Sequence, residues 1–208
     1  MNASEAVLCN FQSATFSQSG TSSNQYIAPE STMGVAISEL FQSFGLRFEF
    51  EIESMWWQRR PQHEELYKIV KTQVARETGT ENGNERLMFH GTALDVAKSI
   101  INSPIGFNRS FNEVGVHGRG VYFSRDLNYS HNYAKPAAGD QQGVRTMLLS
   151  RVVVGNATQG TQADVEAPQG FHSTCRRGDD TTNPVNVAVF RDGQALLEVA
   201  VRYRTSDP

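Results

Sequence analysis

One segment of the chain organises the interpretation of the rest: Gly118-Arg119-Gly120-Val121-Tyr122-Phe123-Ser124, leading on to Tyr129-Ser130-His131-Asn132-Tyr133. Its two glycines let the backbone adopt positive φ or approach a ligand closely. Tyr122 and Tyr133 present flat faces on which a planar group can stack, and Ser130 adds a hydroxyl for hydrogen bonding. Together they predict a slot for a flat ring that bears an amide. The alternative interpretation is a loop that enters a strand of ordinary core aromatics.

The partner of this slot lies upstream, where an apolar strand ends in His90-Gly91-Thr92. A histidine at a strand end, followed by a glycine with free backbone groups, suits ribose hydroxyls and a carboxamide. A single histidine in such a place is usually structural, so its significance depends on the tyrosines and serine of the first segment. The spacing from Thr92 to Asp95 is that of a capping box, which predicts that a helix begins there.

In the order and spacing of these motifs, the chain resembles the poly(ADP-ribose) polymerase-like ADP-ribosyltransferases of the diphtheria-toxin type. The similarity extends from about residue 46 to residue 204, with further matching segments at 105–111, 183–190 and 194–197. One of these motifs alone would be unspecific, whereas five in the family's order are specific.

The resemblance implies an α+β fold with a split, two-sheet, mostly antiparallel core, flanking helices, and NAD bound in the cleft between the sheets. The pattern of strand-like and helix-like segments also predicts an α+β class. By implication, the chain is an NAD+ ADP-ribosyltransferase that uses NAD as co-substrate, releases nicotinamide and needs no metal.

The same resemblance assigns roles to individual residues. The backbone of Gly91 and the hydroxyl of Ser130 would bind the carboxamide of NAD. Tyr122 and Tyr133 would sandwich the nicotinamide ring, and His90 would hydrogen-bond the adenine-side ribose.

Two further residues, Thr92 and Arg109, match the family pattern less specifically. The guanidinium of Arg109 suits a diphosphate or an adenine. Arg109 is equally well interpreted as a solvated loop residue.

The chain departs from the polymerising members of the family at Asn186, where those members carry glutamate. A carboxylate can accept a proton from a ribose or acceptor hydroxyl, whereas asparagine can hydrogen-bond but cannot act as a base. Members without the glutamate resemble transferases of a single ADP-ribose unit. Another carboxylate, from Asp192 or Glu198, is an alternative source of a base.

We therefore expect a protein mono-ADP-ribosyltransferase in which His90, Tyr122 and Asn186 form the catalytic set. Its acceptors would be Glu or Asp side chains of proteins, including its own. Such acceptors are already anionic and need no base. The alternative is a catalytically weak or inactive module that binds NAD or ADP-ribose for regulation.

The domain organisation is predicted from composition. Residues 1–44 are rich in Ser, Gln, Thr and Asn up to about residue 32, which predicts a disordered N-terminal tail. A short amphipathic helix is expected near its end, from the helical spacing of Ile37, Leu40, Phe41 and Phe44. Residues 45–208 are expected to form the catalytic domain.

Several elements follow from periodicity. Residues 46–53 alternate as a half-buried strand, and residues 146–154 are apolar enough for a central strand. Residues 155–182 read as irregular chain. Residues 185–190 and 195–203 are predicted to form a hairpin across Asp192-Gly193, with one face of the last strand carrying Leu197, Val199, Val201 and Tyr203.

Two helices are expected around the predicted site. The helix at 64–77 would bury Leu66, Ile69, Val70 and Val74. The helix after His90-Gly91-Thr92 would bury Val96, Ala97, Ile100 and Ile101.

Composition argues against several other functions. The formal net charge of −3 gives no basic field for nucleic acid or an anionic membrane. No apolar run approaches the ~20 residues of a membrane span. Residues 1–46 contain no Lys or Arg, which argues against secretory and mitochondrial signals, so a cytoplasmic or nuclear location is expected.

The remaining histidines receive structural interpretations. His172 and Cys175 have one metal-ligand-like spacing but no second pair to complete a zinc site. His117 and His131 are interpreted as plain surface or loop residues.

Overall fold

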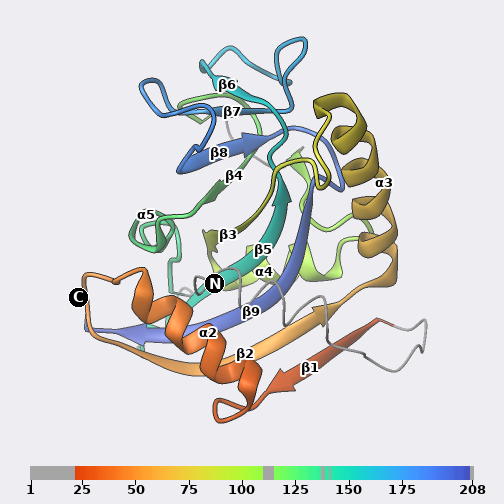
Figure 1. Cartoon of the computed structure of the whole chain (residues 1–208). Coiled ribbons are helices and arrows are strands. Elements are labelled where there is room, and N and C mark those ends of the chain that lie inside the picture. The colour runs from red at the N-terminus through yellow and green to blue at the C-terminus, as the bar shows by residue number, and fades with distance from the viewer. Residues whose placement is uncertain (1–21, 110–114, 137–138, 141, 207–208) are drawn as a thin grey trace.

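A computed structural model of the chain describes residues 22–109, 115–136, 139, 140 and 142–206. In chain order its elements are β1 (Ser23–Ile27), α2 (Thr32–Ser43), β2 (Phe50–Arg59), α3 (Pro61–Thr78), β3 (Glu85–Thr92), α4 (Leu94–Asn102), β4 (Val121–Ser124), α5 (Leu127–His131), β5 (Arg145–Val153), β6 (Ala157–Gln159), β7 (Ser173–Cys175), β8 (Asn186–Val189) and β9 (Ala195–Thr205), as shown in Figure 1. Short strands β6 and β7 lie within the segment predicted to be irregular.

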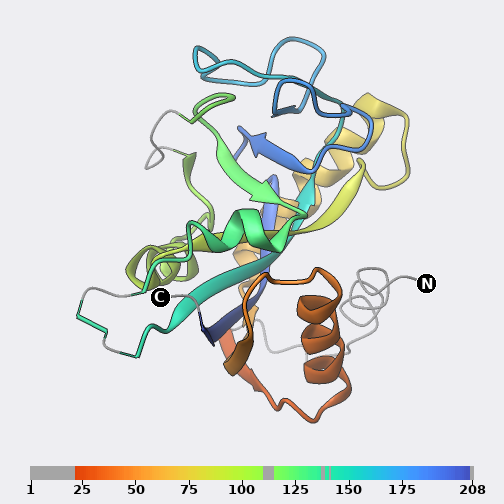
Figure 2. The same ribbon diagram turned by 90° about the vertical axis from the view of Figure 1, so that its left-hand side faces the viewer.

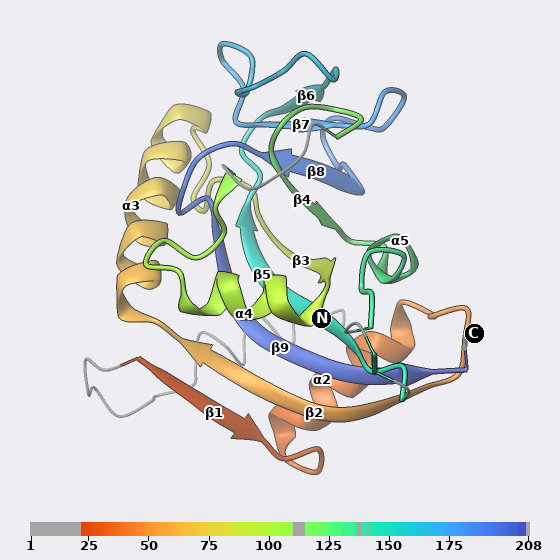
Figure 3. The ribbon, with the colours of Figure 1, turned by 180° about the vertical axis from the view of Figure 1, so that it is seen from behind.

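The strands form one sheet in the order β1-β2-β9-β5-β3-β4-β8-β7-β6, antiparallel except for the pair β6 and β7. The sheet is continuous but split. Strand β3 pairs with β5 along its whole length, whereas it meets β4 only where Phe89 pairs with Ser124. The two groups of strands, β1-β2-β9-β5-β3 and β4-β8-β7-β6, therefore diverge from that point (Figure 3). The split, mostly antiparallel α+β core is confirmed.

Helices cover both faces of the larger group of strands. Helix α2 packs on one face with Ile37, Leu40 and Phe41 fully buried, which confirms the predicted amphipathic helix. The ring of Phe41 contacts that of Phe89 edge-on at 5.7 Å, directly behind the His90 motif. Helix α4 lies over the opposite face, so α2 and α4 enclose β9 and β5 between them (Figures 2 and 3).

The predicted tail needs correction over residues 23–32. Residues 23–27 form edge strand β1, which pairs in register with β2 from Ser23↔Arg59 to Ile27↔Met55. Four of its five side chains are exposed, and Ile27 alone is buried. A strand held mainly by backbone hydrogen bonds can be as polar as a tail, so composition misled here. Residues 1–21 lie outside the described residues.

Strand β2 begins at Phe50, later than predicted, and continues through both tryptophans to Arg59. Trp57 is buried, whereas Trp56 is half-exposed and packs edge-on against Tyr26 of β1 at 5.3 Å.

The buried face of α3 differs from the predicted one. Tyr67, Val70 and Val74 face β5 and β9, while Ile69 is 65% exposed. The hydroxyl of Tyr67 donates a 2.6 Å hydrogen bond to the buried carboxylate of Glu85. Val70 and Val74 are thus buried as predicted, whereas Tyr67, with its polar partner, takes the buried place expected for Ile69.

The predicted hairpin of the last two strands is wrong. Strand β8 pairs with β4 and β7, whereas β9 pairs with β2 and β5, so the turn at Gly193 joins the two groups of strands. The buried side chain of Gln194 holds this crossover. Its Nε2 donates to the carbonyls of Val153 at 2.9 Å and His172 at 2.7 Å. These long-range bonds override the local turn signal.

A β-bulge at Glu198 corrects a second prediction for β9. Val199 pairs with Leu149 and Leu197 with Ser150, so Glu198 is an extra residue in the ladder. Leu197 therefore packs in a different core cluster from Val199. The carboxylate of Glu198 is buried in an ion pair with Arg151, and burial raises its pKa to about 7 although Arg151 opposes the rise.

Candidate active site

Gly91 lies on β3 past its single pairing with β4, where its backbone is close to that of helix α5. A side chain at Gly91 would place its Cβ 1.8 Å from the carbonyl oxygen of Ser130. The hydroxyl of Ser130 donates to the carbonyl of Phe89 at 3.2 Å. Because backbone groups alternate in direction along a strand, those of Gly91 face the same side as those of Phe89. The Gly91 backbone and the Ser130 hydroxyl, predicted to act together, are therefore neighbours.

His90 connects the two groups of strands across the split. Its Nδ1 lies 2.8 Å from the carbonyl oxygen of Tyr122, which can only accept, so Nδ1 carries the hydrogen. Burial lowers the pKa of His90, opposed by this hydrogen bond, so the ring is neutral near pH 7. In that tautomer Nε2 is an acceptor and can receive a hydrogen bond from a hydroxyl.

A cavity of about 310 Å³ opens beside His90. It is lined by His90, Val96, Ser99, Ile100, Ser103, Gly106, Phe107, Asn108 and Val121. Val96, predicted to be buried, is 45% exposed, whereas Ala97 is the buried residue of α4. Sequence reasoning missed this cavity, although the apolar residues of α4 and Phe107 that line it were a usable signal.

The hydroxyl of Tyr122 is held by two hydrogen bonds to the loop before β4. The Oη atom donates to the carbonyl of Gly118 at 2.7 Å and accepts from the N–H of His117 at 3.1 Å. Gly118 has a φ of 118°, and a Cβ there would lie 2.8 Å from the ring of Phe190. The predicted need for glycine at position 118 is confirmed by this positive φ and this close approach.

Tyr133 is 54% exposed and packs beside Tyr129, with ring centroids 5.4 Å apart. Burial raises the pKa of Tyr122, the N–H of His117 lowers it, and the nearby phenol of Tyr133 raises it again. The two predicted ring-stacking tyrosines are thus electrostatic neighbours. Each packs on a different ring, Tyr122 on His117 and Tyr133 on Tyr129.

Asn186 lies on the same face of the smaller strand group as Tyr122. Ser124 pairs with Asn186, and two residues along, Tyr122 pairs with Ala188, so these side chains project to one side. Asn186 is only 8% exposed, and its Oδ1 has no hydrogen-bond partner in residues 22–109, 115–136, 139, 140 and 142–206. A buried acceptor of this kind is suited to a ligand hydroxyl.

The less specific residues are placed differently. Thr92 remains the buried last residue of β3 and does not cap α4, whose N-cap is Ala93 without a side-chain bond. The predicted capping box is therefore wrong. Arg109 is exposed, with its Nη1 3.5 Å from the carbonyl of Val165. Residues 110 and 111 of the matching loop lie outside the described residues.

Comparison of the sequence with known proteins identifies the family of this chain. Residues 47–202 match the family model of the poly(ADP-ribose) polymerase catalytic domain. The chain belongs to the poly(ADP-ribose) polymerase family. It is 32% identical over 152 residues to human protein mono-ADP-ribosyltransferase PARP12, covering 68% of this chain and 20% of that protein.

The chain is also 25% identical over 161 residues to mouse protein mono-ADP-ribosyltransferase PARP11, covering 67% of this chain and 48% of that protein. A probable poly [ADP-ribose] polymerase of Dictyostelium discoideum is 35% identical over 85 residues, covering 39% of this chain and 24% of that protein. The alignments therefore span between a fifth and a half of these members of the poly(ADP-ribose) polymerase family.

Two histidines of this poly(ADP-ribose) polymerase family member were misinterpreted from sequence. His117 and His131 are 2% and 3% exposed, so neither is a surface residue, although His117 lies in a turn as the loop interpretation expects, whereas His131 ends α5. The Nδ1 of His131 lies 2.8 Å from the hydroxyl of Tyr203, which fixes α5 to β9. Glu198 is equally removed from its suggested role, because it pairs with Arg151 rather than facing Asn186.

The described residues contain neither a metal-ligand cluster nor a membrane-spanning helix. Within the described part of the chain, no three His, Cys, Asp or Glu side chains gather as a metal site would require. None of the helices found there has the length and apolar character needed to cross a bilayer.

Proposed function

We propose that this chain is an NAD-dependent protein mono-ADP-ribosyltransferase, which transfers one ADP-ribose unit to acceptor side chains and releases nicotinamide. The single observation that carries the proposal is the meeting of Gly91, Ser130 and His90 at the split in the sheet, beside the cavity of about 310 Å³. The catalytic-domain match and the mono-ADP-ribosyltransferase names of PARP12 and PARP11 support it.

The residues present fit NAD as co-substrate. The Gly91 backbone and the Ser130 hydroxyl offer donors and acceptors for a carboxamide, and Tyr122 and Tyr133 offer ring faces. The neutral His90 offers Nε2 to a ribose hydroxyl. Thr92 borders this group from the end of β3, and exposed Arg109 would meet the diphosphate or the adenine.

Cleavage of the nicotinamide–ribose bond needs stabilisation of the positive charge that develops at C1′. The buried Oδ1 of Asn186, which none of the described residues hydrogen-bonds, would accept a hydrogen bond from a ribose hydroxyl. An amide cannot remove the proton of an incoming ribose hydroxyl, so chain elongation is disfavoured. An acidic acceptor attacks as a carboxylate without a base, which makes Glu and Asp side chains, including those of the chain itself, the proposed acceptors.

The second candidate is a regulatory module that binds NAD or ADP-ribose without transfer. One observation favours it, namely the asparagine in place of a carboxylate at position 186. The geometry of Gly91 and Ser130 argues for the transferase, because a module for ADP-ribose alone has no use for a nicotinamide slot.

The test is incubation of the purified chain with labelled NAD, followed by denaturing electrophoresis. We expect a discrete band of one ADP-ribose unit that neutral hydroxylamine releases. In parallel, a benzamide should raise the melting temperature. At a hundredfold excess over its dissociation constant, its binding should stabilise the folded chain by ~2.7 kcal/mol. A benzamide shift without label supports the binding module, and the absence of both contradicts the assignment of the slot.

A further inference from the structure

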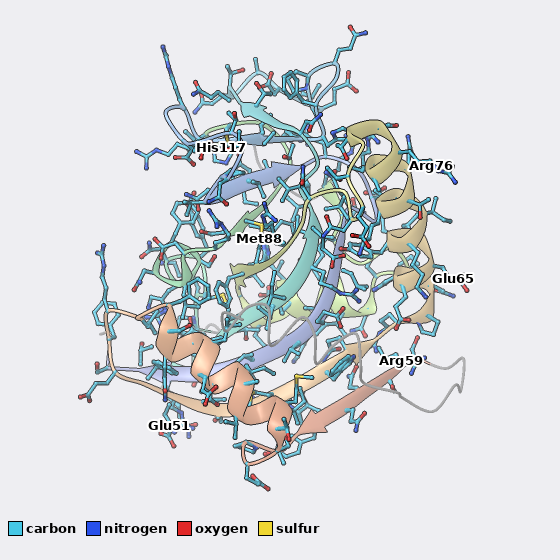
Figure 4. All side chains as sticks on the ribbon, in the orientation of Figure 1. Glu51, Arg59, Glu65, Arg76, Met88 and His117 are labelled. Atoms are coloured by element: carbon cyan, nitrogen blue, oxygen red, sulfur yellow. The ribbon has the colours of Figure 1, made fainter. Side chains whose placement is uncertain are left out.

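His117 is a buried histidine whose ring nitrogens have no hydrogen-bond partner among the described residues. Within the part of the chain that the structure describes, neither Nδ1 nor Nε2 hydrogen-bonds to another residue, although His117 is only 2% exposed. Its backbone is held on both sides: the N–H donates to Tyr122 Oη at 3.1 Å, and the carbonyl accepts from Thr174 Oγ1 at 2.6 Å. The imidazole is therefore fixed in place by contacts that do not involve its own nitrogens. Figure 4 shows His117 beside β7.

An unpartnered buried imidazole costs free energy that an aromatic hydrocarbon at the same place would not. The ring of His117 lies against that of Tyr122, with centroids 4.5 Å apart, a contact that phenylalanine could make equally well. Packing alone therefore does not explain a histidine. Such groups in native proteins call for a ligand or a chemical role.

The imidazole lies on the face of the sheet that carries the proposed site. Thr174, Ala188 and Tyr122 stand opposite one another on β7, β8 and β4, so their side chains share a face. Asn186 follows two residues along β8 on that same face. Two unpartnered polar groups, the ring of His117 and the Oδ1 of Asn186, thus adjoin Tyr122 and its strand.

Among the described residues, one ring contact and two charges act on the imidazole of His117. Tyr122 contacts its ring, and the loop after β7 contributes the carboxylate of Asp179 and the guanidinium of Arg176. Burial lowers the pKa of His117, Asp179 opposes this and Arg176 adds to it, so the ring is neutral near pH 7. Oδ2 of Asp179 is likewise buried, and no described residue hydrogen-bonds to it. A neutral imidazole with a carboxylate nearby can take up a proton and have its positive charge stabilised.

We propose that His117 is a general base for hydroxyl acceptors, which gives the site a second transfer activity toward aliphatic hydroxyl side chains. This inference rests on the proposed transferase function. In the step, the hydroxyl oxygen bonds to C1′ of the NAD ribose while the C1′–nitrogen bond breaks and its electron pair leaves with nicotinamide. The hydroxyl proton passes to a ring nitrogen of His117 and then to water. Asp179 is a positioning residue that stabilises the imidazolium.

The test compares two linkages on acceptor peptides that differ only in one serine or one glutamate. Label on glutamate is an ester that neutral hydroxylamine releases, whereas label on serine is an acetal that it does not release. We expect His117→Phe, which keeps the ring, to lower the ratio of serine-linked to glutamate-linked label at least tenfold. General-base assistance typically contributes ~10²–10⁴-fold.

Asp179→Asn should lower the same ratio, while the matched change Asp180→Asn, one residue along at an exposed carboxylate, should not. In the parent, the rate of transfer to serine should also decrease at pH values below the pKa of His117. This decrease should be absent from His117→Phe. Circular dichroism and the benzamide melting shift establish that each variant is folded with an intact nicotinamide slot.

Four results would overturn the inference. An unchanged ratio in folded His117→Phe excludes a base, and an equal loss of both linkages shows that His117 only shapes the site. Glutamate label without serine label in the parent excludes the second activity. No label of either kind, with or without a benzamide shift, refutes the transferase itself and the base with it.

Discussion

Replacement of Gly91 by alanine tests the contact on which the proposed nicotinamide slot depends. The new Cβ would lie 1.8 Å from the carbonyl oxygen of Ser130, and real Cβ atoms keep at least 3.0 Å from such neighbours. The new Cβ is bonded directly to the backbone of β3, and the atom it meets is a backbone oxygen of α5, so neither can turn aside. Helix α5 must move away by about 1.2 Å, taking Ser130 with it.

Overpacking of this kind costs ~1–3 kcal/mol, which for a domain of this size lowers the melting temperature by roughly 2–12 °C. A displacement of about 1 Å in a positioning group costs on the order of 10²-fold in rate. We expect Gly91→Ala to lose the benzamide shift and most label transfer while remaining folded at 20 °C. The measurements are thermal denaturation with and without benzamide, and transfer from labelled NAD.

Gly170→Ala is the control, because Gly170 has a φ of 84° but nothing within 4 Å of its would-be Cβ. It suffers backbone strain alone, on a loop that contributes nothing to the slot. If Gly91→Ala melts and reacts like the parent, β3 and α5 do not touch as described, and the slot is assigned wrongly.

Three further predictions follow from single residues. Tyr133→Ala should leave the melting temperature almost unchanged, since Tyr133 is 54% exposed. It should weaken benzamide binding by ~0.5–1.5 kcal/mol, or about 2- to 12-fold, because one stacking face is lost. Calorimetric titration measures the affinity, and an unchanged affinity would show that Tyr133 does not stack. Asn186→Glu should still give a single-unit band on electrophoresis, because elongation also needs a loop geometry that admits ADP-ribose as acceptor; a ladder of products would contradict this. Glu198 has a pKa of about 7 in the folded state against 4.5 ordinarily, so between these pH values the folded chain binds more protons than the unfolded chain. The stability of the fold should therefore decrease as the pH rises from about 4.5 to 7. Glu198→Gln should flatten the profile of melting temperature against pH, and an unaltered slope would mean that another group titrates.

The proposed base bears on how a family member without the glutamate can react. Asn186 cannot remove a proton, and the buried acid Glu198 is held by Arg151. His117 is the titratable side chain that lies against Tyr122 on the proposed site. On this proposal, the choice between acidic and hydroxyl acceptors depends on the imidazole of His117 rather than on the side chain at position 186.

Residue types and spacing determined the α+β class, the amphipathic helix α2 and the glycine requirement at position 118, and the resemblance that the motifs carry implied the family and its split core. These features depend on local chemistry that short motifs encode, such as helical spacing or a positive φ. The candidate residues His90, Gly91, Ser130, Tyr122 and Asn186 came from the same motifs, and the chain brings them to the split between the two strand groups.

Only the tertiary structure decided where the chain crosses from one strand group to the other, which face of α3 is buried and that polar residues 23–27 form β1. In each case a partner distant in sequence outweighs the local pattern. Gln194 hydrogen-bonds to the carbonyls of Val153 and His172, Tyr67 hydrogen-bonds to Glu85, and β1 pairs with β2. The burial of His117 belongs to the same class, because it depends on Tyr122 and Thr174 holding its backbone. Contacts between residues far apart in sequence carry no periodic signal, so they become visible only when the chain is folded.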